Sequence, residues 1–236
     1  MSKFFAKDWK GSRFIWFGKA HILTLLVILL VNVLLIWFGK HASDKTINII
    51  AYAMAGILWV NELSFHLWKA RIGEWTIQEM LPLHLCSLLV WTGGLMLVTK
   101  NYSIYEFCYF LGIAGAFQAL LTPDLDKYGF PHFRFFQTYI SHGLIITAAI
   151  YMTVVVGFRP TWMSLLRVAL WGNIYMAIVF VINKLIGSNY LFVAHKPPTA
   201  SLLDKLPAWP WYIAWMEVIG LVMCLLLYMP FAFKGG

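Results

Sequence analysis

The stretch LPLHLCSLLV at residues 81–90 places a histidine and a cysteine at the start of a long apolar run. An imidazole can take and return a proton near neutral pH, and a thiolate can attack a carbonyl carbon. His84 and Cys86 are therefore candidate catalytic residues. Two residues apart on a helix, they point about 200° away from each other. We expect His84 to face a polar interior and Cys86 to face away, because a free cysteine commonly packs like a small apolar side chain.

Other ionisable side chains lie in further apolar runs. His142 is part of the stretch YISHGLIITAAIYM, and Glu217 is an isolated carboxylate in the last apolar run. Glu62 and His66 are four residues apart, which predicts a carboxylate–imidazole pair on one helix face. Ionisable groups in such surroundings are costly unless they face a protein interior or water, so each of them marks a candidate site.

The composition indicates the class of protein that must position these groups. Apolar residue types make up 61% of the chain and charged types only 12%, which predicts an integral membrane protein. Seven segments are long enough to cross about 30 Å of hydrocarbon as helices. They are residues 21–38, 47–68, 80–98, 104–121, 134–157, 162–185 and 209–232. We therefore predict an all-α bundle of about seven transmembrane helices, forming one domain over residues 21–236, with Pro82 at the first helical position of the third span.

The basic residues predict how the chain lies in the membrane. Residues 1–20 are basic and aromatic, which is typical of a segment at the membrane interface. Twelve of the eighteen Lys and Arg fall on the side of the N-terminus. The positive-inside rule then predicts a multi-pass cell-membrane protein with a cytoplasmic N-terminus and an extracellular C-terminus. The net charge of +8 is dispersed between apolar spans, so we expect membrane lipids and not nucleic acid as partners.

The polar residues of different spans share one depth. Glu62 and His66 end the second span, His84 begins the third, His142 lies early in the fifth, and Glu217 lies about two turns into the seventh. This distribution predicts one polar chamber that opens to the N-terminal side. A metal ion among His66, His84 and His142 is conceivable, but ligands on separate helices form no spacing motif. The three cysteines suggest neither a disulfide framework nor a zinc site, and nothing indicates a cofactor. The oligomeric state stays open.

The connection over residues 186–208 is longer than two neighbouring helices need. It contains Asn189, Lys196 and several prolines, which are unfavourable in a membrane span. We interpret it as a lid or re-entrant element over the chamber, with Lys196 available for a lipid phosphate. The alternative is an ordered interfacial loop that only fixes the last helix.

Four stretches carry a resemblance to a known family. They are LPLHLCSLLV (81–90), FQALLTPDLDKY (117–128), YISHGLIITAAIYM (139–152) and SNYLFVAHKPP…WPWYIAW (188–215). In this order the chain resembles the YwaF-type bacterial integral membrane proteins, which are related to transmembrane protein 164 of animals. The resemblance implies a phospholipid acyltransferase that uses a Cys and a His. The family's Pro-Cys-His tripeptide falls on Pro82-Leu83-His84 and its second His on His142, so Leu83 replaces the cysteine and Cys86 lies three residues further on.

The leading hypothesis is therefore acyl transfer on a phospholipid or lysolipid. His84 or His142 would be the general base, and the second His or Asn189 would stabilise the oxyanion. Glu62, His66, Asn189, Lys196 and Glu217 would bind the substrate or orient a ring. A Cys86 thioester is the variant of this mechanism if the thiol faces the chamber. The alternatives are a binding or transport protein that recognises a lipid headgroup or a small polar solute, and a scaffold or sensor without catalysis.

Overall fold

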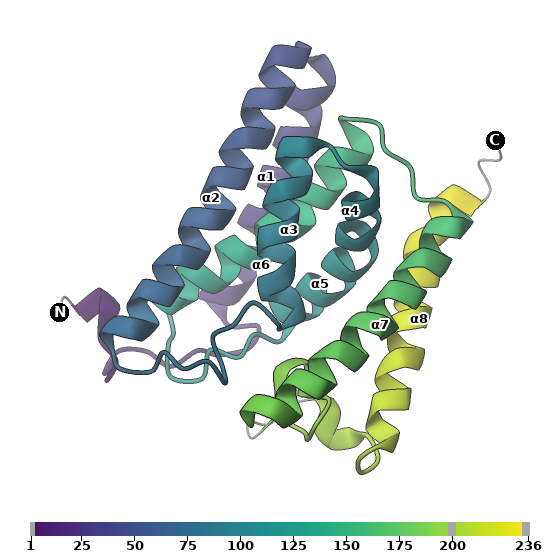
Figure 1. Cartoon of the computed structure of the whole chain (residues 1–236). Coiled ribbons are helices and arrows are strands. Elements are labelled where there is room, and N and C mark those ends of the chain that lie inside the picture. Colours follow the sequence, from purple (N-terminus) through teal and green to yellow (C-terminus); the bar gives the residue numbers. More distant parts are fainter. Residues whose placement is uncertain (1–2, 198–201, 233–236) are drawn as a thin grey trace.

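The computed structural model describes residues 3–197 and 202–232, and in this part of the chain every regular element is a helix (Figure 1). Lys234 and residues 198–201 of the predicted lid lie outside the described residues. The α-helices are α1 (Lys19–His41), α2 (Asp44–Arg71), α3 (Leu85–Thr99), α4 (Tyr102–Phe107), α5 (Ile113–Leu121), α6 (Phe133–Val154), α7 (Trp162–Ile186) and α8 (Trp211–Ala232). A π-helical segment, Cys108–Gly112, joins α4 to α5 into one rod. Short 3-10 turns occupy Lys3–Phe5, Tyr190–Phe192 and Leu202–Lys205.

Each predicted span corresponds to one of these rods, and the protein is an all-α, multi-pass membrane protein. Within the described residues, five rods are long and apolar enough to cross a membrane: α1, α2, the α4–α5 rod, α7 and α8. α3 is apolar but shorter. α6 is more polar because it is the central helix, packed against α1, α2, α3 and α5. Its buried side chains include Gln137, Ser141 and Thr147, and neighbouring helices rather than lipid surround them.

The third helix begins later than the sequence predicts. Residues 81–84 precede it, and His84 is the N-cap of α3 in an extended conformation. The backbone of this segment bonds to side chains from elsewhere in the fold: the Leu81 N–H donates to the Tyr190 hydroxyl (2.8 Å) and the Leu83 carbonyl accepts from the Tyr175 hydroxyl (2.9 Å). The prediction that Pro82 starts the helix is therefore wrong, because these tertiary bonds take the backbone groups that a first turn would use.

The N-terminal segment packs on the loops at the same end of the bundle. The Phe5 carbonyl accepts from the Trp68 indole (3.0 Å), and Arg13 pairs with Asp126 (3.0 Å). Glu74, in the loop after α2, lies between Lys69 (2.9 Å) and Lys7 (3.0 Å). Hydrogen bonds from these two ammonium groups, first that of Lys69, lower the pKa of Glu74 below its ordinary value. These contacts hold the N-terminal segment against the loops at the end of the bundle where α1 begins.

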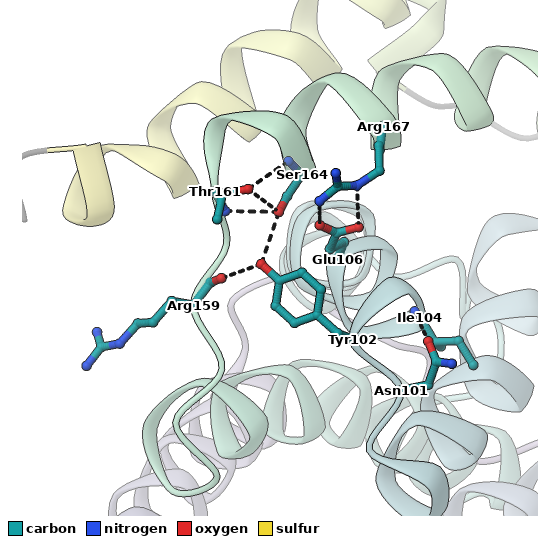
Figure 2. A network of polar contacts seen from close by, with 8 residues as sticks. All are labelled: Asn101, Tyr102, Ile104, Glu106, Arg159, Thr161, Ser164 and Arg167. Atoms are coloured by element: carbon teal, nitrogen blue, oxygen red, sulfur yellow. Dashed lines mark hydrogen bonds and ion pairs between the residues drawn. The ribbon is translucent and has the colours of Figure 1, made fainter. Parts of the chain in front are cut away.

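A polar network at the opposite end ties α7 to α4 (Figure 2). Thr161 and Ser164 form a capping box at the start of α7, and the Tyr102 hydroxyl donates to the Arg159 carbonyl (2.6 Å). Two N–H groups of the Arg167 guanidinium donate to the carboxylate of Glu106, and the bond from Nε to Oε2 is 3.0 Å long. Glu106 is 1% exposed. The sequence-based candidates do not include this pair, which joins two helices far apart in the chain.

Candidate functional site

The side of the bundle where α1 begins holds a layer of paired polar groups between α2 and α6. The Asn61 side-chain amide donates to the Ser141 hydroxyl (2.7 Å) and to the backbone carbonyl of Gln137 (2.9 Å). The side chain of Gln137 in turn donates from Nε2 to the Ser141 hydroxyl (3.3 Å), and its Oε1 accepts from the Arg134 guanidinium. Arg134, Gln137 and Ser141 of α6, together with Asn61 of α2, therefore form a continuous chain of hydrogen-bonded side chains, here called the polar ladder. It follows α6 from its first turn towards the membrane interior.

Glu62 lies next to this ladder and reaches α3. Its carboxylate is buried, accepts a hydrogen bond from Ser87, and interacts electrostatically with Arg134. The predicted pair with His66 forms, with 3.7 Å between Oε1 of Glu62 and Nε2 of His66. Because the Trp75 indole donates to Nδ1 of His66 (3.0 Å), a neutral ring carries its proton on Nε2, the side that faces Glu62.

His142 lies one residue beyond the ladder, half-buried on α6. Its Nδ1 is 2.7 Å from the carbonyl of Thr138. A carbonyl only accepts, so the proton is on Nδ1 and Nε2 keeps a free lone pair. The hydroxyl of Thr138 itself is buried and has no hydrogen-bond partner among the described residues. The ring is therefore prepared to accept a proton at Nε2.

His84 lies beneath the turn formed by Tyr190–Phe192. Its ring packs on the edge of Tyr190 (5.0 Å between centroids) and against Phe192 (5.3 Å). The Leu191 N–H points to Nδ1 of His84 at 3.4 Å. Because this N–H is a donor, Nδ1 is the acceptor, and a neutral His84 carries its proton on Nε2. The two histidines thus favour opposite tautomers, and no hydrogen bond or ring contact joins them in the described part of the chain.

Cys86 is half-buried in the first turn of α3, within electrostatic range of the Glu62 carboxylate. No hydrogen bond from its sulfur to an imidazole is present in the residues described. Neither does this part of the chain gather three His, Cys, Asp or Glu side chains at a distance that suits a metal ion.

The other predicted binding residues have structural partners. The Asn189 side chain organises its own loop: its amide donates to the His195 carbonyl (2.7 Å) and its oxygen accepts from the Ala194 N–H (3.2 Å). The Lys196 ammonium donates to the Leu206 carbonyl (2.7 Å). These bonds link described residues on both sides of the connection between α7 and α8.

Glu217 lies outside the polar layer. Its Oε2 accepts from the Asn173 amide (3.1 Å), and both residues are exposed in the middle of the α7–α8 hairpin. The sequence-based expectation is that Glu217 shares the depth of the polar chamber. The structure differs because α8 begins beyond the 190–206 connection, so its second turn reaches the depth of mid-α7.

Two cavities lie at the end of the bundle where α1 begins. One, of about 190 Å³, is between residues 12–21 and two phenylalanines, Phe130 and Phe135. The other, of about 210 Å³, lies between the end of α2, the 124–128 loop and Arg134. Neither is lined by His84, Cys86 or His142. Arg134 is not among the sequence-based candidates; the signal that indicates it is an arginine among aromatic residues at the start of a span that also carries His142.

The fold and this polar layer define a multi-pass α-helical membrane protein with ionisable groups inside its helix bundle. The profile of the TMEM164 family matches residues 16–228, so the chain belongs to the TMEM164 family. It is also similar to a protein of Treponema pallidum (strain Nichols) named only as an uncharacterized protein. The two are 24% identical over 226 residues, which cover 92% of this chain and 90% of that one. No solved structure matches the chain.

Proposed function

We propose that this protein is a cell-membrane acyltransferase that moves a fatty acyl chain between phospholipids or lysolipids by histidine chemistry. The observation that carries the proposal is the His142 ring, whose Nδ1 proton is held by the Thr138 carbonyl, so that the lone pair is on Nε2, for which the described residues supply no hydrogen-bond donor. An imidazole in this state can act as a general base towards a hydroxyl. Family membership, and the acyltransferase activity that the resemblance implies, support the same reading.

The reaction assigns complementary roles to the two rings. Nε2 of His142 takes the proton of the acceptor hydroxyl while the hydroxyl oxygen attacks the ester carbonyl of the donor lipid. The tetrahedral oxyanion accepts a hydrogen bond from Nε2–H of His84. When the intermediate collapses, the donor's alkoxide leaves and takes the proton back from His142. A new ester and a lysolipid result, and no cofactor takes part.

The test is acyl redistribution by the purified full chain in mixed phospholipid and lysophospholipid, followed by mass spectrometry. His142→Gln is expected to lower the rate about 100-fold or more, since it removes the base. His41→Gln is the matched control, because Nδ1 of His41 also bonds the carbonyl four residues earlier (2.7 Å to Trp37), but this ring is exposed on the end of α1 far along the chain from the polar layer.

The same assay separates the alternatives. Under the histidine mechanism, the Cys86→Ser variant keeps its acyl-transfer activity. Loss of activity in this variant, together with a trapped acyl-enzyme in the wild type, would establish a thioester route. Wild-type protein that never redistributes acyl chains, yet co-purifies with an unchanged lipid or solute, would contradict the proposal in favour of a binding or transport protein.

We also propose that the N-terminus is cytoplasmic and the C-terminus extracellular. The support is the excess of Lys and Arg on the side where α1 begins. In this orientation the polar layer and both cavities lie in the cytoplasmic half of the membrane.

A further inference from the structure

Arg134 is a cation without a direct anionic partner. It is the second residue of α6, and its guanidinium carbon lies 4.2 Å from the ring centroid of Phe65. One N–H donates to the side chain of Gln137. No carboxylate lies within 4.0 Å of it in the described part of the chain; Asp124 and Glu62 act on it only at longer range. A guanidinium offers five N–H donors in a planar fork, so most of its binding capacity is unused.

The cavity at Arg134 is large enough for a ligand. Its volume of about 210 Å³ far exceeds the roughly 15 Å³ that one ordered water needs. Its walls come from three places in the chain: Trp68 and Lys69 at the end of α2, the 124–128 loop, and Arg134. These three segments meet at the membrane face where α1 begins.

The charges around this cavity leave a positive excess. Lys69 is paired with Glu74 (2.9 Å) and Asp126 with Arg13 (3.0 Å). Among the described wall residues that leaves Arg134 and Lys127 against Asp124. A planar guanidinium with a second cation nearby recognises a tetrahedral oxyanion through charge-assisted, often bidentate, hydrogen bonds. The chemistry of the cavity therefore fits a phosphate group.

The place of the cavity fits a phosphate that belongs to a lipid. Trp68 and the Tyr128 ring, which form part of its wall, are typical of the headgroup level. Arg134 precedes His142 by eight residues on α6, about 12 Å of helix rise. In a glycerophospholipid the ester bonds lie deeper than the phosphate, so α6 presents the cation and the proposed base in the order of the lipid's own groups.

We propose that this cavity is a phosphate-binding site with Arg134 as its principal ligand, and that a phospholipid headgroup is the source of the phosphate. The role of this site in selecting phospholipid substrates rests on the proposed acyl transfer. The binding of a phosphate group at Arg134 does not depend on that reaction.

The test is direct binding to the full chain in a zwitterionic detergent, by calorimetry, with dihexanoyl phosphatidic acid, dihexanoylglycerol and inorganic phosphate as probes. The wild type is expected to bind the first and not the second. Arg134→Gln should weaken binding about tenfold or more, and Arg134→Lys, which keeps the charge but loses the fork, should weaken it less. Asp124→Asn should tighten binding, because it removes the carboxylate that competes for Arg134.

Arg71→Gln is the control, since it removes a charge from the same end of α2 at an exposed residue outside the cavity. Equal affinity of Arg134→Gln and Arg71→Gln, or equal binding of the lipids with and without phosphate, overturns the proposal. If inorganic phosphate binds as tightly as dihexanoyl phosphatidic acid, the phosphate-binding site stands, but the proposal that a lipid supplies the phosphate is overturned. Phosphate-dependent binding without acyl transfer contradicts the proposed function and leaves this site standing.

Discussion

At the scale of single residues, hydrogen-bond partners decide what each histidine can do. His142 faces a carbonyl, an acceptor, and His84 faces a backbone N–H, a donor. A neutral His142 can therefore accept a proton at Nε2, whereas a neutral His84 can donate one from Nε2, which are the roles that the proposed reaction needs. The turn that contacts His84 has a strained backbone: Leu191 and Phe192 have φ values of 58° and 55°, which are unfavourable for bulky side chains.

Asn183 holds the strained turn in place, and its substitution should release it. Its amide donates to the Tyr190 carbonyl (2.9 Å) and its oxygen accepts from the Tyr190 N–H (2.8 Å). Asn183→Ala leaves both buried groups unpaired and should lower the free energy of unfolding by about 2–4 kcal/mol. Denaturant unfolding in detergent measures this change, and nitrogen NMR of His84 should show mixed tautomers.

Asn173→Ala serves as the control for that measurement, because Asn173 is in the same helix but exposed. It should change the free energy of unfolding far less and leave the His84 tautomer unaltered. Equal effects of the two substitutions would show that the turn does not depend on Asn183.

At the scale of elements, the α7–α8 hairpin is attached to the rest of the bundle at its ends and along its length. The 190–192 turn contacts His84, and Arg167 pairs with Glu106 near the start of α7. Between these contacts, the Tyr175 hydroxyl donates to the Leu83 carbonyl (2.9 Å) and the Tyr109 hydroxyl donates to the Leu227 carbonyl (2.9 Å).

Arg167→Gln should destabilise the protein, because it leaves the buried Glu106 carboxylate without a partner. We expect the thermal midpoint in detergent to fall by several degrees. The double variant Glu106→Gln/Arg167→Gln removes the buried charge together with its partner and should recover most of the loss. A double variant as unstable as Arg167→Gln alone would mean that the ion pair is not the cause.

At the scale of the whole molecule, the two ends of the bundle differ. α1 begins and α8 ends at opposite ends (Figure 1), as an odd number of crossings requires. The N-terminal segment, the charged loops and both cavities gather at the first of these ends. In the proposed function, a lipid substrate would enter from the leaflet at that end and meet Arg134 before the polar layer.

Reporter fusions measure the orientation. A green fluorescent reporter after Gly73 should fluoresce in cells, whereas alkaline phosphatase after Gly157 should be active, because the chain alternates sides between α2 and α6. Exchanging the two reporters should silence both. Activity of the phosphatase after Gly73 would place the N-terminal side outside the cell and with it the proposed phosphate site.

The amino-acid sequence determined the class of fold and the depth of Glu62 and His142, although not that of Glu217. Hydropathy and length alone predict seven rods, and the position of Glu62 or His142 within its rod gives its depth in the membrane. Spacing within one helix also predicts the Glu62–His66 pair, because residues four apart must share a face.

Only the tertiary structure decided which polar groups meet. Asn61 with Ser141, Glu106 with Arg167 and His84 with the 190–192 turn join residues far apart in the chain. These contacts depend on how each helix is rotated about its axis and on where it starts, as the late start of α3 shows. Hydropathy fixes neither quantity, since a helix of uniform apolarity has no preferred face. Side-chain packing and hydrogen bonding between helices set both.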